Sequence, residues 1–596
     1  MSTTVANYIC KQLIKRNIKY AFGYSGGANL PLLDAFYSNK QIQFIKNSTE
    51  QCSGFVAEGF SKSLYLAQPG IIVTTSGPGL TNIITPLQNA YSDGTPMIAI
   101  SAQVPTHAIG TDAFQECPAV KLTKHCTKWN IQIKNKDEII SALDTAFNIS
   151  MSPRKGPVHI DIPKDILLQT IDLTNEEKKN KFYHVTEING GNIYNKIDTF
   201  VKLLNKSKKP IIIAGQGCNN GYKGLREFAI KHNIPVTTTI HGVGSFDENH
   251  KLSLEMLGMH GNPVANYGVQ EADMIIAIGT RFDDRITGNL KEFGLNAIDA
   301  GSNSRGGIYH IDSSLNQINK VRKLFSKYYD NIDSFTKFIE CDSYTFFNFC
   351  NNRNIITKKN NWINNLFDYK SKNKYYYNEN NKLKAPDVIK CINQTIDELK
   401  INRDNLYFTT GVGNHQMWTS QHIKWTTPNK MITSGSLGTM GVGVPFAIGS
   451  KLANPYSMVI CIDGDSSFCM TSNELQTILE NNINIKIAIM NDSRQQMVHV
   501  WQKLFHNSRY IATDNINPDF KKLGESYNIM SIDCSNKTKL KETVKDFLEY
   551  DEAIIGVFNI DPEMCYPLVA PGKSLDDMIL NENDLIKLNK DTNAPN

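Results

Sequence analysis

Residues 458–468 read MVICIDGDSSF, and a helical segment (473–482) and a second apolar run, IKIAIM (485–490), follow them. Neither apolar run alternates with polar residues, which is typical of central strands in a parallel sheet. Asp465 follows the first strand directly, where the turn at Gly464–Ser467 opens a helix. Because a helix N-terminus presents free N–H groups and a positive dipole end, this stretch predicts an α/β unit with a phosphate-binding strand tip.

Apolar runs of the same kind recur along the chain and alternate with amphipathic segments. They lie at 71–76, 97–102, 159–162, 211–215 and 274–279. This alternation predicts the α/β class, with three doubly wound parallel-sheet domains. Polar stretches divide the chain into domains at 1–170, 190–342 and 386–580, a polar linker region at 343–385 and a polar tail at 581–596.

The composition excludes several classes of function. The 596 residues carry a net charge of only +5, and no run of Lys and Arg indicates a nucleic-acid partner. No apolar stretch approaches the ~20 residues of a membrane span, and the N-terminus shows no signal or transit pattern, so a cytoplasmic location is expected. The 12 cysteines lack zinc-site spacing and are expected to be reduced and mostly buried.

Two carboxylates are the candidate metal ligands. Asp465 and Asp492 follow consecutive predicted strands, and such tips border the ligand crevice of an open α/β sheet. Mg²⁺ commonly binds one or two carboxylates together with phosphate oxygens. The motif alone is equally compatible with a helix cap and a turn.

Beyond this motif, the chain resembles the thiamine-diphosphate-dependent acetolactate (acetohydroxyacid) synthases, large or catalytic subunit, over about residues 5–580. Gly464–Ser467 with Asn491-Asp492 resembles the family's diphosphate motif. Further matching segments are AFGYSGGANLPLLDAF (21–36), IKNSTEQCSGFVAEGFSKS (45–63), VTTSGPGLTN (73–82), AISAQVPTHAIGTDAFQECP (99–118), TTGVGNHQMW (409–418) and ITSGSLGTMGVGVPFAIG (432–449). The resemblance implies a pyrimidine-binding, a central flavin-binding and a diphosphate-binding domain.

The resemblance also implies cofactor roles. Glu50 is expected to activate thiamine diphosphate by hydrogen-bonding its pyrimidine ring, and Gly27 to lie near the reacting carbon. In isolation, Glu50 and the nearby Glu58 would both be expected to be solvated helix residues. The metal site is assigned to Asp465, Asp492 and Arg494. The expected thiamine diphosphate contacts are Gly413, Asn414, His415, Gly438, Met440, Ser466, Ser467 and Met497.

A flavin and a substrate channel are implied by EMLGMHGN (255–262) and AIGTRFDDRITG (277–288). The expected FAD contacts are Arg154, Gly217, Thr239, Met259, His260, Gly279, Arg281, Asp284 and Asp312. Arg285 suits a substrate carboxylate, because Arg forms bidentate charged hydrogen bonds. Trp501 matches the residue that favours 2-ketobutyrate as acceptor. Phe114, Gln115 and Lys164 match residues that reach the site from a neighbouring subunit, which implies a homodimer or tetramer.

The implied reaction decarboxylates pyruvate and transfers the two-carbon hydroxyethyl unit to a second 2-keto acid, with thiamine diphosphate, Mg²⁺ and FAD as cofactors and a regulatory subunit as a possible partner. Several residues depart from the family pattern: Ser25, Thr49, His241, Ser436, Ser466 and Asp492. These departures leave open a related flavoprotein that uses another acceptor, such as a keto-sugar, and a catalytically weakened or non-enzymatic relative. A dinucleotide dehydrogenase is disfavoured, because no G-x-G-x-x-G follows a strand with an acid ~20 residues on.

Overall fold

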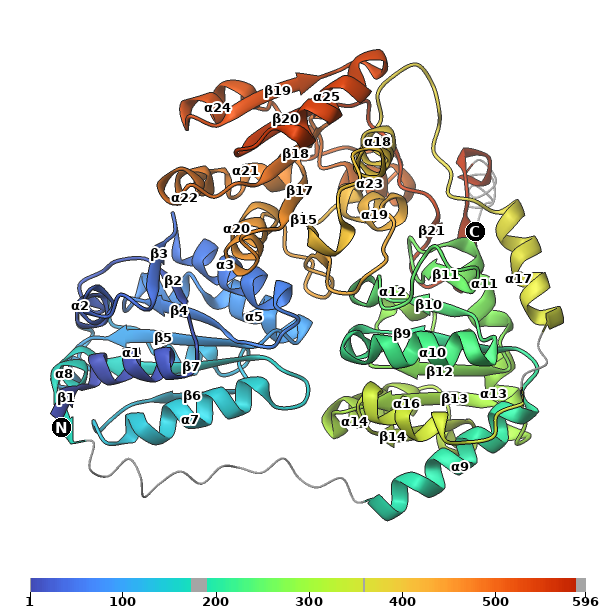
Figure 1. Cartoon of the computed structure of the whole chain (residues 1–596), viewed down its shortest axis with the longest axis horizontal. Coiled ribbons are helices and arrows are strands. Elements are labelled where there is room, and N and C mark those ends of the chain that lie inside the picture. The colour runs from blue at the N-terminus through green and yellow to red at the C-terminus, as the bar shows by residue number, and fades with distance from the viewer. Residues whose placement is uncertain (1, 173–189, 357–359, 586–596) are drawn as a thin grey trace.

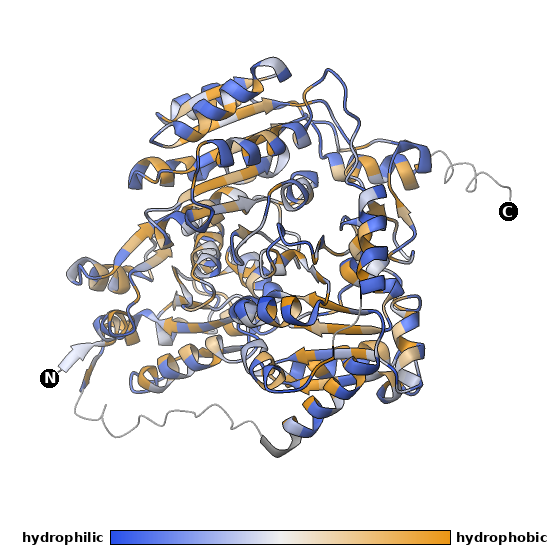
Figure 2. Cartoon of the chain, turned by 45° about the vertical axis from the view of Figure 1, so that its right-hand side comes forward, coloured by the Kyte–Doolittle hydropathy of each residue, from blue (hydrophilic) through white to orange (hydrophobic). Residues whose placement is uncertain are grey.

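Three six-stranded parallel sheets follow one another along the chain (Figure 1). The structure is a computed structural model that describes residues 2–172, 190–356 and 360–585. The N-terminal domain is blue in Figure 1, the middle domain green and the C-terminal domain orange to red. In each, helices with polar outer faces cover apolar strands (Figure 2). This arrangement confirms the predicted fold class.

The N-terminal sheet has the strand order β3-β2-β4-β5-β7-β6. Its strands are β2 (Tyr20–Gly23), β3 (Gln43–Lys46), β4 (Gly70–Thr74), β5 (Met97–Gln103), β6 (Trp129–Gln132) and β7 (Pro157–Pro163). Its helices are α1 (Val5–Lys15), α2 (Leu30–Ser38), α3 (Glu50–Ser63), α4 (Pro78–Thr81), α5 (Ile84–Asp93), α6 (Ala119–Thr123), α7 (Glu138–Met151) and α8 (Lys164–Leu168). A small antiparallel pair, β1 (Ser2–Thr4) with β8 (Thr170–Asp172), joins the two ends of the domain.

The middle sheet has the order β11-β10-β9-β12-β13-β14. Its strands are β9 (Pro210–Ala214), β10 (Val236–Thr238), β11 (Ser253–Met256), β12 (Met274–Ile278), β13 (Gly307–Asp312) and β14 (Thr336–Glu340). Its helices are α9 (Gly190–Lys206), α10 (Tyr222–His232), α11 (Pro263–Glu271), α12 (Asp284–Thr287), α13 (Leu295–Ser302), α14 (Leu315–Phe325), α15 (Ile332–Phe335), α16 (Ser343–Asn351) and α17 (Asn360–Lys372).

The C-terminal sheet has the order β16-β15-β17-β18-β20-β19. Its strands are β15 (Leu406–Thr410), β16 (Met431–Ile432), β17 (Met458–Gly464), β18 (Lys486–Asn491), β19 (Met530–Cys534) and β20 (Ile554–Asn559). Its helices are α18 (Ala385–Glu398), α19 (Asn414–His422), α20 (Gly443–Ala453), α21 (Asp465–Cys469), α22 (Leu475–Asn481), α23 (Gln496–Phe505), α24 (Phe520–Ser526) and α25 (Lys537–Glu549). The pair β21 (Leu568–Val569) and β22 (Met578–Ile579) lies beyond this sheet.

All seven apolar runs that the sequence predicts as strands are strands: β4, β5, β7, β9, β12, β17 and β18. The region 343–385 differs from the predicted polar linker, because it contains helices α16 and α17. Phe346, Phe347 and Ile363 of these helices join the core of the middle domain. The apolar residues of these helices lie on one helical face, between many Asn and Lys residues, so the sequence appears polar throughout unless it is analysed at helical spacing. The predicted tail lies outside the described residues beyond 585, as does most of the polar stretch between the first two domains.

Helices α3 and α20 join the N-terminal domain to the C-terminal domain. A side chain on Gly449 would lie 2.1 Å from the Val56 carbonyl oxygen, and one on Gly59 would lie 2.6 Å from the Phe446 Cα atom. Because both helices carry glycine at the crossing, their backbones touch. Helix α20 follows the segment 434–440 along the chain, so this contact ties the helix of Glu50 to that segment.

Most of the described cysteines are buried, as expected, and none of them forms a disulfide in the structure. Within 2–172, 190–356 and 360–585, no helix is both long and apolar enough to cross a lipid bilayer.

Candidate active site

The tips of β17 and β18 bring Asp465 and Asp492 together. The two strands are parallel neighbours with Gly464 opposite Met490, so the residues that follow them meet at one sheet edge. Asp465 begins α21 and is buried. Both carboxylates line a cavity of about 70 Å³, here called the diphosphate pocket.

The electrostatics of this pair favour a bound cation. Burial, followed by repulsion from Asp465, raises the pKa of the Asp492 carboxyl to about 7. Burial also raises the pKa of Asp465. A divalent cation between the two groups would relieve both effects, and Mg²⁺ prefers such oxygen ligands. The described residues contain no cluster of three or more His, Cys, Asp and Glu side chains suited to a metal, so carbonyl and phosphate oxygens would complete the coordination.

The departure from the family at Ser466 has a structural answer. Ser466 lies in the first turn of α21 and is not among the residues with positive φ, so its side chain causes no backbone strain. Its hydroxyl accepts a hydrogen bond from Asn515 Nδ2 at 2.5 Å. Asn517 donates to Asp465 Oδ2 at 2.6 Å and to Asn491 Oδ1 at 2.8 Å. Neither asparagine belongs to a motif that the sequence reveals, and together they hold their segment over the carboxylates.

Arg494 can serve the metal site only through its main chain. Its guanidinium donates to Asp514 at 2.8 Å. A guanidinium has no acceptor lone pair and carries a positive charge, so it does not ligate a cation. Only the main-chain carbonyl oxygen of Arg494 remains as a possible ligand.

The diphosphate pocket also gathers most of the predicted thiamine diphosphate contacts. His415 lies with its Nε2 atom 3.3 Å from Asp463 Oδ1. Met440 is half-buried in the wall of the pocket. The predicted residues that line this pocket are Gly413, Asn414, His415, Met440, Asp465, Ser466, Ser467, Asp492, Arg494 and Met497.

A second cavity, of about 1050 Å³, is here called the large cavity. It shares Met497 and Val498 with the diphosphate pocket, so the two spaces adjoin. All the predicted flavin and channel residues of the middle domain lie in its wall. The predicted residues that line it are Arg154, Gly217, Thr239, Met259, His260, Gly279, Arg281, Asp284, Arg285, Asp312, Gly438, Met497 and Trp501.

The large cavity has the chemistry of a dinucleotide site. The buried Thr280 Oγ1 and Asp283 Oδ1 atoms in its wall have no hydrogen-bond partner among the described residues. At Gly279, φ is +61°, and a side chain would lie 2.4 Å from the Gly217 Cα atom. The two glycines therefore let two strand ends pack against each other in the cavity wall, beside Arg154 and Arg281. The guanidinium groups suit a flavin diphosphate, so the residues fit FAD.

Apart from Arg154, the predicted residues of the N-terminal domain line neither cavity of the same chain. Phe114 is 89% exposed, and Gly27 lies open at the surface. Glu50 is half-buried at the start of α3, where its carboxylate accepts a hydrogen bond from Asn82 at 2.9 Å. Gln115 and Lys164 lie on the same domain, also outside both cavities. The structure thus divides the predicted site into two separate groups of residues.

The turn before Glu50 is held by a residue that the sequence analysis missed. Glu474 is fully buried and follows the diphosphate helix α21 along the chain. It accepts hydrogen bonds from Ser48 N at 2.7 Å and from Asn47 Nδ2 at 3.0 Å. Thr49, another departure from the family, caps α3 by accepting from Cys52 N. The backbone that presents Glu50 is therefore fixed by two polar anchors.

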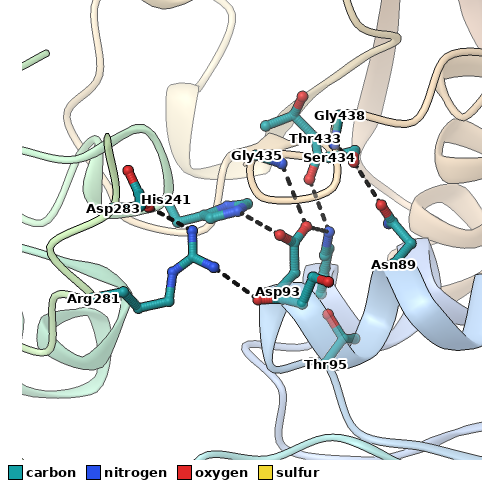
Figure 3. Close-up of polar contacts among 12 residues, drawn as sticks. Asn89, Asp93, Thr95, His241, Arg281, Asp283, Thr433, Ser434, Gly435 and Gly438 are labelled. Carbon is teal, nitrogen blue, oxygen red and sulfur yellow. Dashed lines mark hydrogen bonds and ion pairs between the residues drawn. The ribbon is translucent and has the colours of Figure 1, made fainter. Parts of the chain in front are cut away.

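A second missed feature is a buried charged cluster in helices α3 and α5, of which Figure 3 labels Asp93. Glu58 is fully buried, which corrects the expectation of a solvated residue. Lys62 Nζ lies 2.9 Å from Glu58 Oε1 and 2.7 Å from Asp93 Oδ2. Burial opposes the ionisation of Asp93, but the attraction of Lys62 and His241 outweighs it and holds the pKa of Asp93 well below its usual range. Glu58 and Lys62 stand one helical turn apart in a helix whose only other charged residue is Glu50, and this spacing was the available signal.

Acid should destabilise the protein through buried neutral histidines. Burial lowers the pKa values of His159, His260 and His310 to about 4. Since the unfolded value is about 6.5, their stabilising contribution is complete above pH 6.5 and is lost as the pH falls toward 4. We expect a loss of about 1.4 kcal/mol per pH unit for each histidine in this window, measured by urea unfolding.

His260→Gln tests this pH dependence, and Gln421→Met is its matched control. Gln421 donates to the His260 carbonyl oxygen, so it shares the environment but does not titrate. The His260→Gln protein should show a shallower pH slope, and the Gln421→Met protein the unchanged slope. Equal slopes in all three proteins would contradict the assignment.

Comparison with known proteins agrees with this geometry. Three profiles match, described as thiamine pyrophosphate enzyme N-terminal TPP binding domain (residues 3–122), central domain (197–331) and C-terminal TPP binding domain (411–556). The chain is 39% identical to a mitochondrial acetolactate synthase of Schizosaccharomyces pombe, covering 96% of this chain and 85% of that protein. It is 38% identical to the mitochondrial catalytic subunit of Saccharomyces cerevisiae (96% and 82% covered) and 32% identical to the isozyme 2 large subunit of Escherichia coli (96% and 99% covered).

The fold and the two adjoining cavities define a three-domain α/β protein of the thiamine diphosphate type. The chain belongs to the acetolactate synthase family of the thiamine-diphosphate-dependent enzymes.

Proposed function

We propose that the protein is an acetolactate synthase, which decarboxylates pyruvate and transfers the resulting two-carbon unit to a second 2-keto acid. One observation carries the proposal. The diphosphate pocket, with its carboxylate pair, adjoins the arginine-lined large cavity at Met497 and Val498. A cofactor held by its diphosphate would thus have its reactive end beside a space lined by cationic groups that suit keto acids.

The residues divide the chemical work between them. Thiamine diphosphate, when bound, supplies a carbanion and an electron sink. Asp465 and Asp492 would hold its phosphates through Mg²⁺, and Met440 would support the cofactor from the pocket wall. Arg285 is exposed to the large cavity and would bind a substrate carboxylate, with Trp501 beside the acceptor. Glu50 would hold and move the proton of the pyrimidine ring.

A second copy of the chain would complete the site, and we include this in the proposal. The support is that Glu50, Gly27 and Phe114 lie outside both cavities of their own chain. Phe114 exposes 89% of its surface, and Tyr37 and Leu30 of the same domain are also exposed. Burial of these apolar side chains against another copy would stabilise a dimer. A regulatory partner is suggested by relatives named catalytic or large subunit. A cytoplasmic location is proposed from the sequence alone, whereas both fungal relatives are named as mitochondrial.

The test is an assay of the purified protein with pyruvate alone, with and without thiamine diphosphate, Mg²⁺ and FAD. Acetolactate should accumulate only with the cofactors present, and adding 2-ketobutyrate should divert product to acetohydroxybutyrate. Thiamine diphosphate with Mg²⁺ should also raise the melting temperature, because a ligand that binds the folded state stabilises it. A protein that is stabilised by the cofactors but forms no acetolactate would overturn the proposed activity and favour another acceptor.

A further inference from the structure

The last turn of helix α5 lies between the large cavity and the loop that carries Gly438 and Met440. Asn89 and Asp93 stand four residues apart, so they share one face of this helix. Both side chains are buried. Figure 3 shows the middle domain approaching this turn from one side and the C-terminal domain from the other.

On the side of the large cavity, three cationic or titratable side chains hold this turn. His241 Nε2 lies 3.1 Å from Asp93 Oδ1. The Arg281 and Arg154 guanidinium groups donate to the Ser92 carbonyl oxygen at 3.0 and 2.9 Å. His241, Arg281 and Arg154 all line the large cavity. A ligand in the cavity would therefore contact the same side chains that hold the turn.

On the other side, the turn shapes the segment 434–440, here called the thiamine loop. The Ser434 and Thr439 hydroxyls both donate to Asn89 Oδ1, at 2.6 and 2.9 Å. Ser434 Oγ in turn accepts from Gly438 N at 3.1 Å. The backbone N–H of Gly435 donates to Asp93 Oδ2 at 3.4 Å. The loop is thus built on two side chains of another domain.

His241 touches both ends of this arrangement. Besides its contact with Asp93, its Nε2 atom would lie 2.4 Å from a side chain on Gly435, so the imidazole rests against the thiamine loop. It also lines the large cavity, and its buried Nε2 atom, although close to Asp93, forms no hydrogen bond with the described residues. A ligand packed against the imidazole would fix it against the thiamine loop, and a second ligand at the loop would not bear that ordering cost again.

We propose that the last turn of α5 couples the two cofactor sites, so that FAD bound in the large cavity tightens the binding of thiamine diphosphate at the thiamine loop, with His241, Asp93 and Asn89 as the coupling residues. The inference rests on the proposed function for the identity of the two ligands. Because linkage is reciprocal, thiamine diphosphate tightens FAD binding by the same factor. Lys62 contacts Asp93 Oδ2 at 2.7 Å and donates to the Thr433 carbonyl oxygen at 2.8 Å. It thereby holds the turn of α5 next to the residue that precedes the thiamine loop.

The experiment measures the affinity of the full-length, cofactor-stripped protein for thiamine diphosphate with Mg²⁺, by calorimetry, without FAD and at saturating FAD. We expect FAD to lower the dissociation constant roughly 5- to 10-fold, within the usual range of coupling between sites. Flavin fluorescence, titrated with and without thiamine diphosphate, should give the same factor. An unchanged dissociation constant would overturn the proposal.

Two variants test the coupling from opposite ends. His241→Leu removes the contact with Asp93. Asn89→Ala removes the acceptor of the Ser434 and Thr439 hydroxyls, and residue 89 lines neither cavity. In both, the coupling factor should fall to about 1, although each cofactor still binds alone. If the His241→Leu protein no longer binds flavin, its coupling factor cannot be measured, and the Asn89→Ala protein alone tests the proposal. Coupling that persists in Asn89→Ala would refute the proposal.

The matched control is Lys424→Gln. Lys424 contacts Glu255 at 3.5 Å, between the C-terminal and middle domains, and lies outside the large cavity. This variant should keep the coupling factor of the unmodified protein. The measured quantity is a dissociation constant, so the test does not depend on whether the protein forms acetolactate. A coupled protein that forms no acetolactate refutes the proposed activity alone, and an active protein without coupling refutes only this inference.

Discussion

Replacing Glu50 with Gln should reduce turnover of pyruvate by at least ~100-fold, because the amide cannot take up and release the proton that a positioned carboxylate exchanges. The affinity for thiamine diphosphate should change little, since the Glu and Gln side chains have the same shape. Glu50 is half-buried and accepts from Asn82. It stands in the first turn of α3, so loss of its charge should cost less than ~1 kcal/mol of unfolding free energy. Steady-state assays with saturating cofactors, together with urea unfolding, measure both effects.

The control for Glu50 is Glu138→Gln. Glu138 also lies in the first turn of a helix, α7, where it accepts from Lys134 N. This substitution should leave turnover unchanged. If the Glu50→Gln protein retained more than half of the normal activity, the assigned role would be wrong and Glu50 would serve only the fold.

Replacing Lys62 with Met should lower the unfolding free energy by about 3–5 kcal/mol, the usual cost of breaking a buried ion pair by removing one partner. Without the ammonium group, the Glu58 and Asp93 carboxylates remain buried with no cation between them. The Thr433 carbonyl oxygen also loses its donor. Urea unfolding at neutral pH measures the loss, which should shrink in acid, where both carboxyls bind protons.

Lys46→Met is the matched control for Lys62. Lys46 pairs with Glu480 at 2.9 Å, but both side chains are largely solvated. Exposed pairs of this kind contribute at most about 1 kcal/mol. A similar loss in both variants would show that the buried cluster contributes no more than a surface contact.

The sequence predicts the centre of each sheet better than its edges. Strands such as β9 and β12 are buried on both faces, so they appear as continuous runs of Ile and Ala. The edge strands β6 and β19 are partly exposed, and their mixed polarity resembles that of a loop. The prediction of a polar linker at 343–385 is wrong for a related reason. Its many Asn and Lys residues obscure the few apolar side chains that pack on the middle domain.

Motif matching predicts the members of each cavity well, because those residues follow strand ends whose positions the fold determines. It does not find the residues that hold the site together. Glu474, Asn89 and Asn517 act through contacts with segments far away in the chain. Each is an ordinary polar residue in an ordinary helix or loop, and only tertiary structure reveals its partner.

The contact between helices α3 and α20 also sets an order of events during synthesis. Gly59 and Gly449, which allow this contact, are separated by about 390 residues, so translation at about 5–20 residues per second leaves the first helix waiting for roughly 20–80 s. During that interval the nascent N-terminal domain exposes a glycine-bearing face that has no complementary surface yet. The newborn chain therefore carries this uncovered face from the completion of its first sheet until α20 emerges from the ribosome.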